Sequence, residues 1–529
     1  MSTERPLPNK WVVTISVTFG TMMGAIDSSI VNVAVPHLRG AVGATIEEIT
    51  WVTTGFVIAT VLVMPLTAFL GRFFGQKRVY MAALTVFVVG SALCGMMTSL
   101  GGLVAFRVLQ GLGAGALQPT EQAILRQTFP PEEQGMAMAV FGLAVVLGPA
   151  FGPTLGGYIV DNYAWEWIFY INVPVGLLAL FMVQRFVYEP EDIRKANIER
   201  AAEQRKHMDW AGIALLSLGL AALQYTLEEG GRNDWYESSL ITTTTLVALF
   251  VLAAFAIREL TAPVPAVDIS LFKDRVFLSG TLIGAVMFAM LLSITFLLPV
   301  FMQELLGFTA MQSGIALMPR SLMMMVAMPI VGRLYNKVSP RIFVGFGIVL
   351  FSITAYFMSQ YTLETSQAQI IGVLLVQGVA FACLFIPLTT VALSTIPRPK
   401  LADATGLNSL LRQIGGSTGL AIFASLIPRF TTQANAALAT HVTDARIEVT
   451  QRLALMTRAM ITRGFDETSA AAGARRALGL LVHRQAAVLA FERLFMVAGI
   501  TFLFVLPLLF YLRSPRHGVK PAETPHIEM

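Results

Sequence analysis

Long apolar runs alternate with short polar or proline-containing segments along the chain. Fourteen of these runs reach or approach the length of about 20 residues that a helix needs to cross the hydrocarbon core of a bilayer. This pattern predicts an all-α integral membrane protein with fourteen transmembrane helices. Their approximate limits are 11–35, 51–70, 79–98, 103–123, 136–158, 168–186, 210–227, 239–257, 276–298, 313–331, 342–359, 368–391, 404–427 and 494–512.

The amino-acid composition is that of a membrane protein. Apolar residues make up 55% of the 529 positions and charged residues only 13%, whereas about a quarter of a soluble domain is charged. The net charge of +5 is spread thinly, which argues against disorder and against nucleic-acid binding. Cys94 and Cys383 both lie within apolar runs, so we expect neither a disulfide nor a metal site.

Lysine and arginine are distributed unevenly between the two sets of loops. If the N-terminus is cytoplasmic, the short outer loops hold only Arg39 and Arg232, and most other loop Lys and Arg lie inside. Because positively charged loops stay in the cytoplasm, both termini are predicted to be cytoplasmic. The exception is the segment 428–493, with nine arginines; a loop of this length crosses the membrane largely regardless of charge.

Two loops in different halves of the chain resemble each other. Both are tight basic turns, one after the second span and one after the tenth, although unrelated membrane turns would also be basic and rich in glycine. They favour two related six-helix bundles, the architecture of a transporter that rocks around a site near the middle of the membrane. The loop positions are Gly71, Arg72, Gly75 and Lys77 in the first turn and Gly332, Asn336 and Lys337 in the second.

Spans and loops together predict the domain organisation. The segment 428–493 contains Ala-rich stretches with helical patterning and no apolar run long enough to cross a membrane. The predicted parts are an N-terminal six-helix bundle (1–186), a cytoplasmic linker (187–209), two additional linking transmembrane helices (210–257), a C-terminal six-helix bundle (276–512) that includes a periplasmic helical hairpin at 428–493, and a cytoplasmic tail (513–529).

One acidic residue lies inside the first span. Asp27 is nine residues before Pro36, or about 13 Å along a helix, which places it near the middle of the membrane. An ionisable side chain at this depth is costly and normally faces a cavity or a partner. Asp27 is therefore a candidate to bind and release a proton. A structural aspartate that is permanently paired with an arginine is the alternative.

Two further ionisable residues lie in the fourth span. Arg107 is predicted at a depth close to that of Asp27, and if the two meet, their separation and approach would tie a conformational change to proton release. A static ion pair is the alternative. Glu121 is about 21 Å deeper toward the cytoplasm. It would serve a cationic substrate or a second proton, or else reach the inner interface without a function.

Other polar residues within the spans are weaker candidates. Arg320 and Arg412 are buried cations that would either contact substrate or hold helices together. The predicted substrate-binding residues are Asn32, Gln118, Asn408, Arg412 and Gln413.

The fifth span combines glycines with prolines. Glycines four or five residues apart let another helix approach closely, and prolines remove backbone donors and bend the helix axis. A single such glycine pair would indicate packing alone, whereas the combination suits a bending helix that seals one side of a cavity. The positions are Gly148, Pro149, Gly152, Pro153, Gly156 and Gly157.

These motifs are similar to those of the major facilitator superfamily and, within it, of the fourteen-span drug–proton antiporters of the EmrB/QacA type. The resemblance implies proton-coupling roles for Asp27 and Arg107 and the role of antiport gate for the glycine–proline pattern of the fifth span. It covers nearly the whole chain. The stretches that carry it are Asp27 to Pro36, Arg107 to Gly115, Gly148 to Gly157, Trp165 to Pro174, Val267 to Lys273, Pro387 to Thr390 and Asn408 to Gly419.

One position departs from the family pattern. The loop between spans two and three usually offers an acidic residue followed by a basic one, where this chain has Arg72 and Phe73. The departure puts the charge contact attributed to that loop in doubt, while Asn336 and Lys337 preserve more of the pattern in the second half.

The resemblance also implies the location, a bacterial inner membrane, as well as the function and the partners. We expect a proton-driven exporter of amphipathic drugs, rather than an enzyme, with no cofactor, because no loop ending in Gly-Lys-Ser/Thr is present to bind ATP. The outer segment is like that of the EmrB branch, whose members work with a periplasmic adaptor (a membrane fusion protein, EmrA-like) and an outer-membrane channel (TolC-like). Alternatives are a narrow exporter of a metabolite, fatty acid or siderophore, and a membrane sensor or scaffold without transport.

Overall fold

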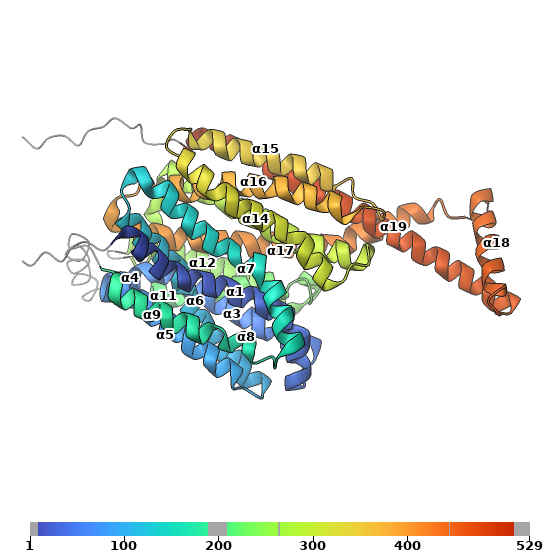
Figure 1. Ribbon diagram of the computed structural model, residues 1–529, viewed down its shortest axis with the longest axis horizontal. Coiled ribbons are helices and arrows are strands. Elements are labelled where there is room, and N and C mark those ends of the chain that lie inside the picture. The colour runs from blue at the N-terminus through green and yellow to red at the C-terminus, as the bar shows by residue number, and fades with distance from the viewer. Residues whose placement is uncertain (1–8, 189–208, 263–264, 444, 513–529) are drawn as a thin grey trace, which may run out of the picture.

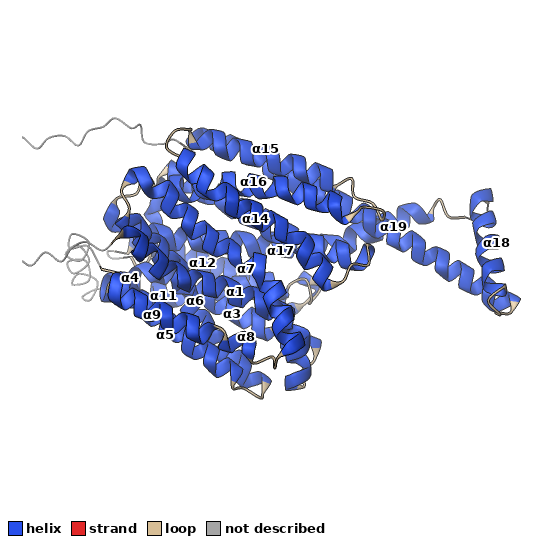
Figure 2. Cartoon of the chain, in the orientation of Figure 1, coloured by secondary structure: helices blue, strands red, loops and turns tan. Residues whose placement is uncertain are grey.

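The computed structural model describes residues 9–188, 209–262, 265–443 and 445–512 (Figure 1). Within these residues every regular element is a helix and no strand occurs (Figure 2). The elements of the N-terminal bundle are α1 (Lys10–Val42), α2 (Ile46–Ile49), α3 (Trp51–Val63), α4 (Thr67–Phe74), α5 (Gln76–Gly95), α6 (Leu100–Thr128), α7 (Gln134–Asn162), α8 (Trp167–Tyr170) and α9 (Asn172–Phe186).

The remaining helices follow a gap in the described residues. The linking pair is α11 (Trp210–Glu229) and α12 (Ser239–Thr261). The helices of the C-terminal half are α13 (Arg275–Val300), α14 (Ala310–Leu334), α15 (Pro340–Met358), α16 (Gln367–Ala392), α17 (Leu401–Ala439), α18 (Ile447–Ile461) and α19 (Glu467–Leu503).

The helices have the lengths that membrane spans require. Among the described residues, thirteen helical segments are long and apolar enough to cross a membrane, and they correspond to predicted spans two to fourteen. Predicted span one lies on α1, which is 33 residues long and buries the polar residues Thr14, Ser16 and Asp27 among apolar ones. The predicted all-α membrane fold is confirmed.

Packing divides the helices into two bundles joined by the linking pair. In the N-terminal bundle α1 packs against α7 and α9, and α3 packs against α6; in the C-terminal bundle α13 packs against α17, and α14 against α16. The bundles meet where α7 contacts α14 and where α6 contacts α17. Helix α11 pairs with α12 and touches both α3 and α17, so it bridges the two bundles.

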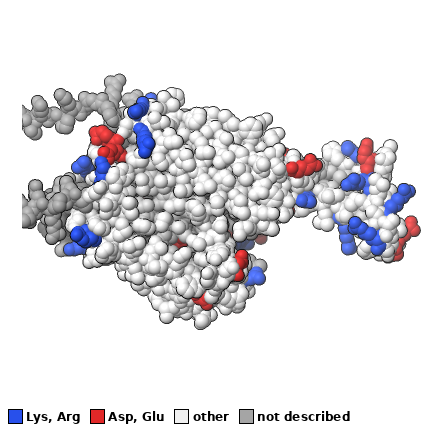
Figure 3. Space-filling model, viewed as in Figure 1, with Lys and Arg blue, Asp and Glu red and all other residues white. Residues whose placement is uncertain are grey.

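The molecule has two chemically distinct ends. Helix α1 begins on one side, here called the termini side, and α18 projects from the opposite side, here called the hairpin side (Figure 1). On the face seen in Figure 3, Lys, Arg, Asp and Glu gather at these two ends and leave an uncharged belt between them. This distribution is what a bilayer around the belt requires.

The projecting segment is built from extensions of two spans. Helix α17 continues through Pro428 to Ala439, and α19 runs without a break from Glu467 into the bundle. Within the segment 428–493, the helices are the end of α17, α18 and the outer part of α19. Most of the predicted linker (187–209) and the whole predicted tail (513–529) lie outside the described residues.

Candidate functional site

Asp27 and Arg107 form an ion pair inside the N-terminal bundle. Arg107 Nη1 lies 2.7 Å from Asp27 Oδ2, and the two side chains are 1% and 0% exposed. The guanidinium also donates through Nε to the carbonyl of Val52 at 3.1 Å and lies 4.1 Å from the ring of Phe56. The desolvated charge pair is thus formed by α1 and α6 and contacted by α3, and α7 packs against α1.

The second carboxylate oxygen of Asp27 is bound by two amides. Gln110 Nε2 donates to Oδ1 at 2.9 Å and Asn172 Nδ2 donates to the same atom at 2.7 Å. Gln110 Oε1 accepts from Arg107 Nη1 at 2.7 Å, and Asn172 also donates to Ser91 Oγ at 3.0 Å. Both oxygens of the carboxylate are therefore held by donors from α6 and α9.

This network ties the charge of Asp27 to contacts among α1, α6 and α9. A proton on Asp27 would remove the negative charge that holds the guanidinium of Arg107 in place, and the arginine would then be left buried without its partner. Conversely, pulling α1 away from α6 would break the contacts of Asp27 with Arg107 and Gln110 and leave Asn172 of α9 as its remaining donor among the described residues. Either event changes the preferred distance between α1, α6 and α9.

Gln110 and Asn172 were not selected as site residues from the sequence. Both stand in motifs that carry the family resemblance, but a neutral amide in an apolar run gives no charge signal. Gln110 lies three residues after Arg107, so the two share a helix face. This spacing is the sequence signal that indicates a contact between Gln110 and Arg107.

The glycines of the fifth span lie directly against the helix that carries Asp27. A Cβ atom at Gly148 would lie 2.3 Å from the carbonyl oxygen of Ala25, and one at Gly152 would lie 2.4 Å from Cβ of Ser29. Gly156 faces Ile30 at 3.1 Å, whereas Gly157 has nothing within 4 Å. Helix α7 therefore approaches α1 closely on both sides of Asp27. The backbones of Pro149 and Pro153 are helical, and their side chains lie outside the described part of the structure.

Glu121 is separate from the Asp27 network. It is fully buried on α6, where its Oε1 accepts a hydrogen bond from Thr18 of α1 at 2.9 Å. Its other carboxylate oxygen has no hydrogen-bond partner among the described residues. A carboxylate in this state has the capacity to hold a proton or to accept a donor from a bound molecule.

A small central cavity lies between the bundles. Its volume is about 140 Å³, and α1, α3 and α6 line it together with one residue of α17. Sites for drug-sized molecules are typically about 300 to 1,000 Å³, so this conformation is too closed to hold such a compound here. The polar lining residues are Thr21, Ser28, Thr60, Gln118 and Gln413.

Only some of the predicted substrate-binding residues line the central cavity. Gln118 and Gln413 line the central cavity, Asn408 and Arg412 are buried on α17, and Asn32 is exposed on α1. Asp27, Arg107 and Glu121 are not among the residues that line the cavity, although Ala25 and Ser28, the neighbours of Asp27, are.

The two bundles are connected at the termini side. Arg72 Nη1 lies 2.5 Å from Oδ1 of Asp403 at the start of α17, and Nη2 donates to the carbonyl of Ala266 at 3.1 Å. Both charged side chains are largely buried. The sequence put a charge contact of this loop in doubt, but the structure contains one, with the basic partner on the N-terminal bundle.

Further contacts close the same side. Asn336 donates to the carbonyl of Glu132, and a Cβ atom at Gly135 would lie 2.8 Å from the carbonyl oxygen of Gly332. Gly75 adopts φ 84° in the turn between α4 and α5, a conformation that favours glycine. The second loop is exposed at Lys337, while Lys77 donates to the carbonyl of Gln184 at 2.7 Å.

An ion pair outside the membrane helices joins two segments that lie next to the residues bound by Arg72. Lys400 Nζ lies 2.6 Å from Oδ2 of Asp268 and ties the loop after α12 to the start of α17. Burial alone would raise the pKa of Asp268, but hydrogen bonds from Lys400 and Ser270 outweigh it and hold the pKa below its usual value. The carboxylate is therefore ionised at neutral pH.

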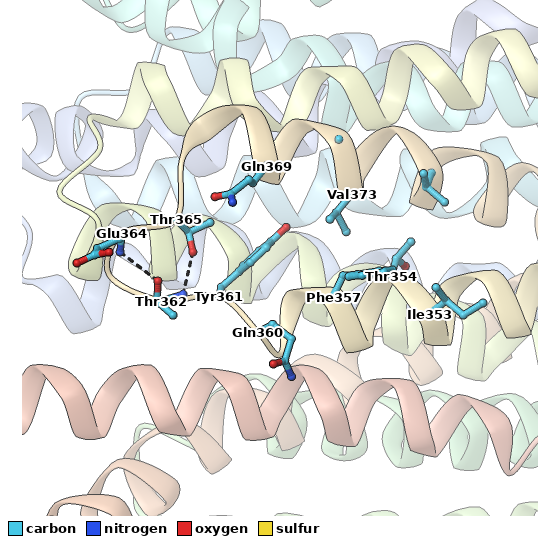
Figure 4. Close-up of a pocket in the computed structure, with 12 residues that line it drawn as sticks. Ile353, Thr354, Phe357, Gln360, Tyr361, Thr362, Glu364, Thr365, Gln369 and Val373 are labelled. Carbon is cyan, nitrogen blue, oxygen red and sulfur yellow. Dashed lines mark hydrogen bonds between the residues drawn. The ribbon is translucent and has the colours of Figure 1, made fainter.

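A larger groove lies away from these residues. It has a volume of about 640 Å³ and opens between α15 and α16 near the hairpin side. Figure 4 shows the ring of Tyr361 between the two helices, with Gln369 and Phe357 along the groove. Because α15 and α16 belong to the C-terminal bundle, this groove is remote from the Asp27 network in the N-terminal one.

Comparison with known proteins places the chain in a family. The model of the Major Facilitator Superfamily matches residues 17–420. The chain belongs to the major facilitator superfamily. The multidrug export protein EmrB of Haemophilus influenzae is 38% identical over 78% of this chain and 79% of its own length. The fatty acid resistance protein FarB of Neisseria gonorrhoeae is 32% identical over 96% of each chain.

Solved structures share the fold of this superfamily member. The human organic anion transporter MFSD10 matches with a TM-score of 0.59 at 16% identity, over 95% of this chain and 100% of the other. The predicted superfamily fold and the similarity to EmrB-type proteins are thereby confirmed. The chain is a multi-pass membrane protein of a transporter superfamily.

Proposed function

We propose that this chain is a proton-coupled multidrug exporter, which takes amphipathic or hydrophobic compounds from the cytoplasm or the inner leaflet and releases them outward. The observation that carries the proposal is the buried pair of Asp27 and Arg107, which lies against the glycine face of α7 and beside the central cavity. Sequence identity of 35% to 38% with EmrB export proteins, over about four fifths of the chain, supports the same function.

The proposed cycle alternates the access of the cavity. With the termini in the cytoplasm, the contacts of Arg72, Asn336 and Gly332 close the cytoplasmic side in this conformation. Protonation of Asp27 from the outside would release Arg107 and loosen α1 from α6. Rocking of the bundles would then open the cytoplasmic side, where loss of the proton leaves the cavity ready for substrate.

Glu121 and the polar residues of the cavity have supporting roles in this proposal. The unpartnered oxygen of Glu121 would accept a second proton or a cationic group. Gln118 and Gln413 would contact substrate once the cavity widens, because they face it from opposite bundles. The polar face of Asn408 and Arg412 adjoins Gln413 on α17.

Transport of chemically different compounds tests the proposal. Purified protein in liposomes with an imposed pH gradient is expected to move several unrelated amphipathic drugs, each with a counterflow of protons reported by a pH-sensitive dye. A panel of drugs in resistance assays separates this from the narrow exporter, which would protect against a single class; the fatty acid resistance of FarB motivates that second candidate. Absence of flux for every compound would contradict both and favour the scaffold.

We further propose that the hairpin side faces the periplasm and docks an adaptor of the membrane-fusion type, which leads to an outer-membrane channel. Helices α18 and α19 expose apolar side chains there, including Ile447, Leu455 and Leu480. Several arginines lie on the same helices. Exposed apolar residues interspersed with arginine are typical of protein interfaces.

Shortening the hairpin tests this partner. Deletion of residues 440–476 with a short Gly-Ser turn keeps the contact between Arg493 Nη1 and Gln433 Oε1 (3.3 Å) and the bond from Arg484 to the carbonyl of Leu305. Cells with the adaptor should lose resistance, while liposome transport should continue at a rate close to that of the full chain. Equal loss in cells and in liposomes would instead indicate a structural role.

A further inference from the structure

Arg412 is a buried cation without an anionic partner. It lies near the middle of the membrane part of α17, is 6% exposed, and its guanidinium carbon is 4.2 Å from the ring centre of Phe288 and 4.7 Å from that of Phe385. Among the described residues it makes no hydrogen bond or ion pair. The two aromatic faces offset part of its charge, but no protein group among the described residues accepts a hydrogen bond from its N–H donors.

The neighbouring polar group has the same deficiency. Asn408 lies one helical turn before Arg412, so both residues share a face of α17. Its side-chain nitrogen, Nδ2, is buried and has no hydrogen-bond partner among the described residues. The face therefore presents hydrogen-bond donors and a positive charge, while the acceptor that would satisfy them is not supplied by the described protein.

The aromatic rings around Arg412 extend across the bundle interface. Phe385 of α16 stacks on Phe141 of α7 at 6.1 Å and lies 6.3 Å from Phe288 of α13. Gln413, the next residue after Arg412, lines the central cavity. The guanidinium thus packs on aromatic rings of the C-terminal bundle, and this aromatic cluster continues to Phe141 of the N-terminal bundle.

The buried charges of the two bundles are paired differently. In the N-terminal bundle, Asp27 is neutralised by Arg107, and the buried Glu121 and Arg126 are one further acid and one further base. In the C-terminal bundle, Arg320 and Arg412 are both buried and neither forms an ion pair within the described residues. Arg320 Nη2 donates to Thr295 Oγ1 at 2.8 Å, while its Nε and Nη1 are buried without a partner among the described residues.

We propose that Arg412 and Asn408 bind the carboxylate of an amphipathic acid, whose apolar part packs among Phe141, Phe288 and Phe385. This inference rests on the proposed export function and narrows its substrates to a class that includes amphipathic carboxylates. Bidentate recognition suits a guanidinium, since its paired N–H groups match the two carboxylate oxygens. Binding would draw the guanidinium away from the rings and supply the missing acceptors.

Direct binding to the purified full chain tests the site without requiring transport. The probes are dodecanoate and dodecyltrimethylammonium, which share one alkyl chain and differ in headgroup charge, titrated below their micellar concentrations by displacement of a fluorescent ligand. The wild-type protein is expected to bind dodecanoate about ten-fold more tightly than the cation, in line with a charged hydrogen-bonded pair. Arg412→Gln is expected to bring this ratio close to one.

Two variants control for charge and for folding. Arg320→Gln removes the other unpaired buried arginine of the C-terminal bundle and should change the ratio by less than about two-fold, because Arg320 lies on α14 and donates to Thr295, whereas the proposed site is on α17. Arg412→Lys keeps the charge but loses the planar fork, and should lower dodecanoate affinity several-fold while the protein keeps its melting temperature. It serves as the test if Arg412→Gln does not fold.

The outcomes separate this site from the proposed function. The proposal is overturned if Arg412→Gln weakens both probes equally, if Arg320→Gln matches its effect, or if the wild-type protein has no preference for dodecanoate. Loss of dodecanoate preference in Arg412→Gln, in a protein that shows no proton-driven flux, would support the anion site and contradict proton-coupled export. Proton-driven flux together with no preference for dodecanoate would support proton-coupled export and contradict the anion site.

Discussion

Replacing Asp27 by Asn is expected to abolish drug efflux driven by a pH gradient in liposomes. The carboxylate is the group that would carry the proton, and an amide in its place cannot exchange one at physiological pH. Efflux down a drug gradient, or exchange of labelled for unlabelled drug, should continue more slowly, because neither requires a proton. The measurement is the initial rate of efflux with and without the pH gradient, at equal protein content.

The stability of this variant needs a matched control, because it leaves Arg107 buried without its partner. Breaking a buried ion pair on one side typically costs about 3 to 5 kcal/mol, much of it from the uncompensated charge. The double variant Asp27→Asn with Arg107→Gln removes both charges and should recover most of the lost melting temperature. It should still lack proton-driven efflux. That combination separates coupling from folding.

Retained proton-driven efflux of several drugs in Asp27→Asn would exclude Asp27 as the proton carrier. Glu121 would then become the leading candidate, since it is the other buried carboxylate of the N-terminal bundle and has an oxygen without a partner. Recovery of proton-driven efflux in the double variant, with none in Asp27→Asn alone, would show that the single variant failed because of the unpaired Arg107.

Much of the fold could be predicted because hydrophobic length and charge distribution determine membrane topology directly. Each of the thirteen apolar helices coincides with a predicted span, and charge inside spans was rare enough to single out Asp27 and Arg107. Their meeting at 2.7 Å required only that both lie at one depth on neighbouring helices. Reasoning from sequence position alone works here because the membrane fixes the depth of each residue along its helix.

The rest of the site depends on rotation about helix axes, which the membrane does not fix. Asn32 lies five residues after Asp27 and was expected at the substrate site, but it is exposed. Gln110 and Asn172 complete the Asp27 network, yet as neutral amides they resemble any polar residue in a span. The contact of Arg72 with Asp403 joins residues far apart in sequence, which no local pattern indicates.

The glycines of α7 show how the structure distinguishes positions that the sequence treats alike. Six residues of the motif were assigned to one gate, but Gly148 and Gly152 touch α1, whereas Gly157 touches nothing within 4 Å. Gly148 and Gly152 therefore lie on the face of α7 that packs against α1, whereas position 157 has free space beside it.

Replacing Gly148 by Ala is accordingly expected to eliminate transport, while Gly157→Ala is expected to be tolerated. The added methyl at position 148 would lie 2.3 Å from the carbonyl oxygen of Ala25, so α1 and α7 must separate next to Asp27. Overpacking of this kind costs about 1 to 3 kcal/mol. At position 157 the methyl meets open space, and alanine gains about 0.5 to 1 kcal/mol of helix stability over glycine.

Melting temperature and proton-driven efflux, measured together for the two variants, test this distinction. Gly148→Ala should melt at a lower temperature and lose efflux, and Gly152→Ala should behave similarly because its methyl would meet Ser29. Gly157→Ala should match or exceed the wild-type protein in both measurements. Equal activity of the 148 and 157 variants would mean that α1 and α7 separate at no cost, in which case close packing beside Asp27 does not seal the proton site, and the coupling must depend on the contacts of Arg107 alone.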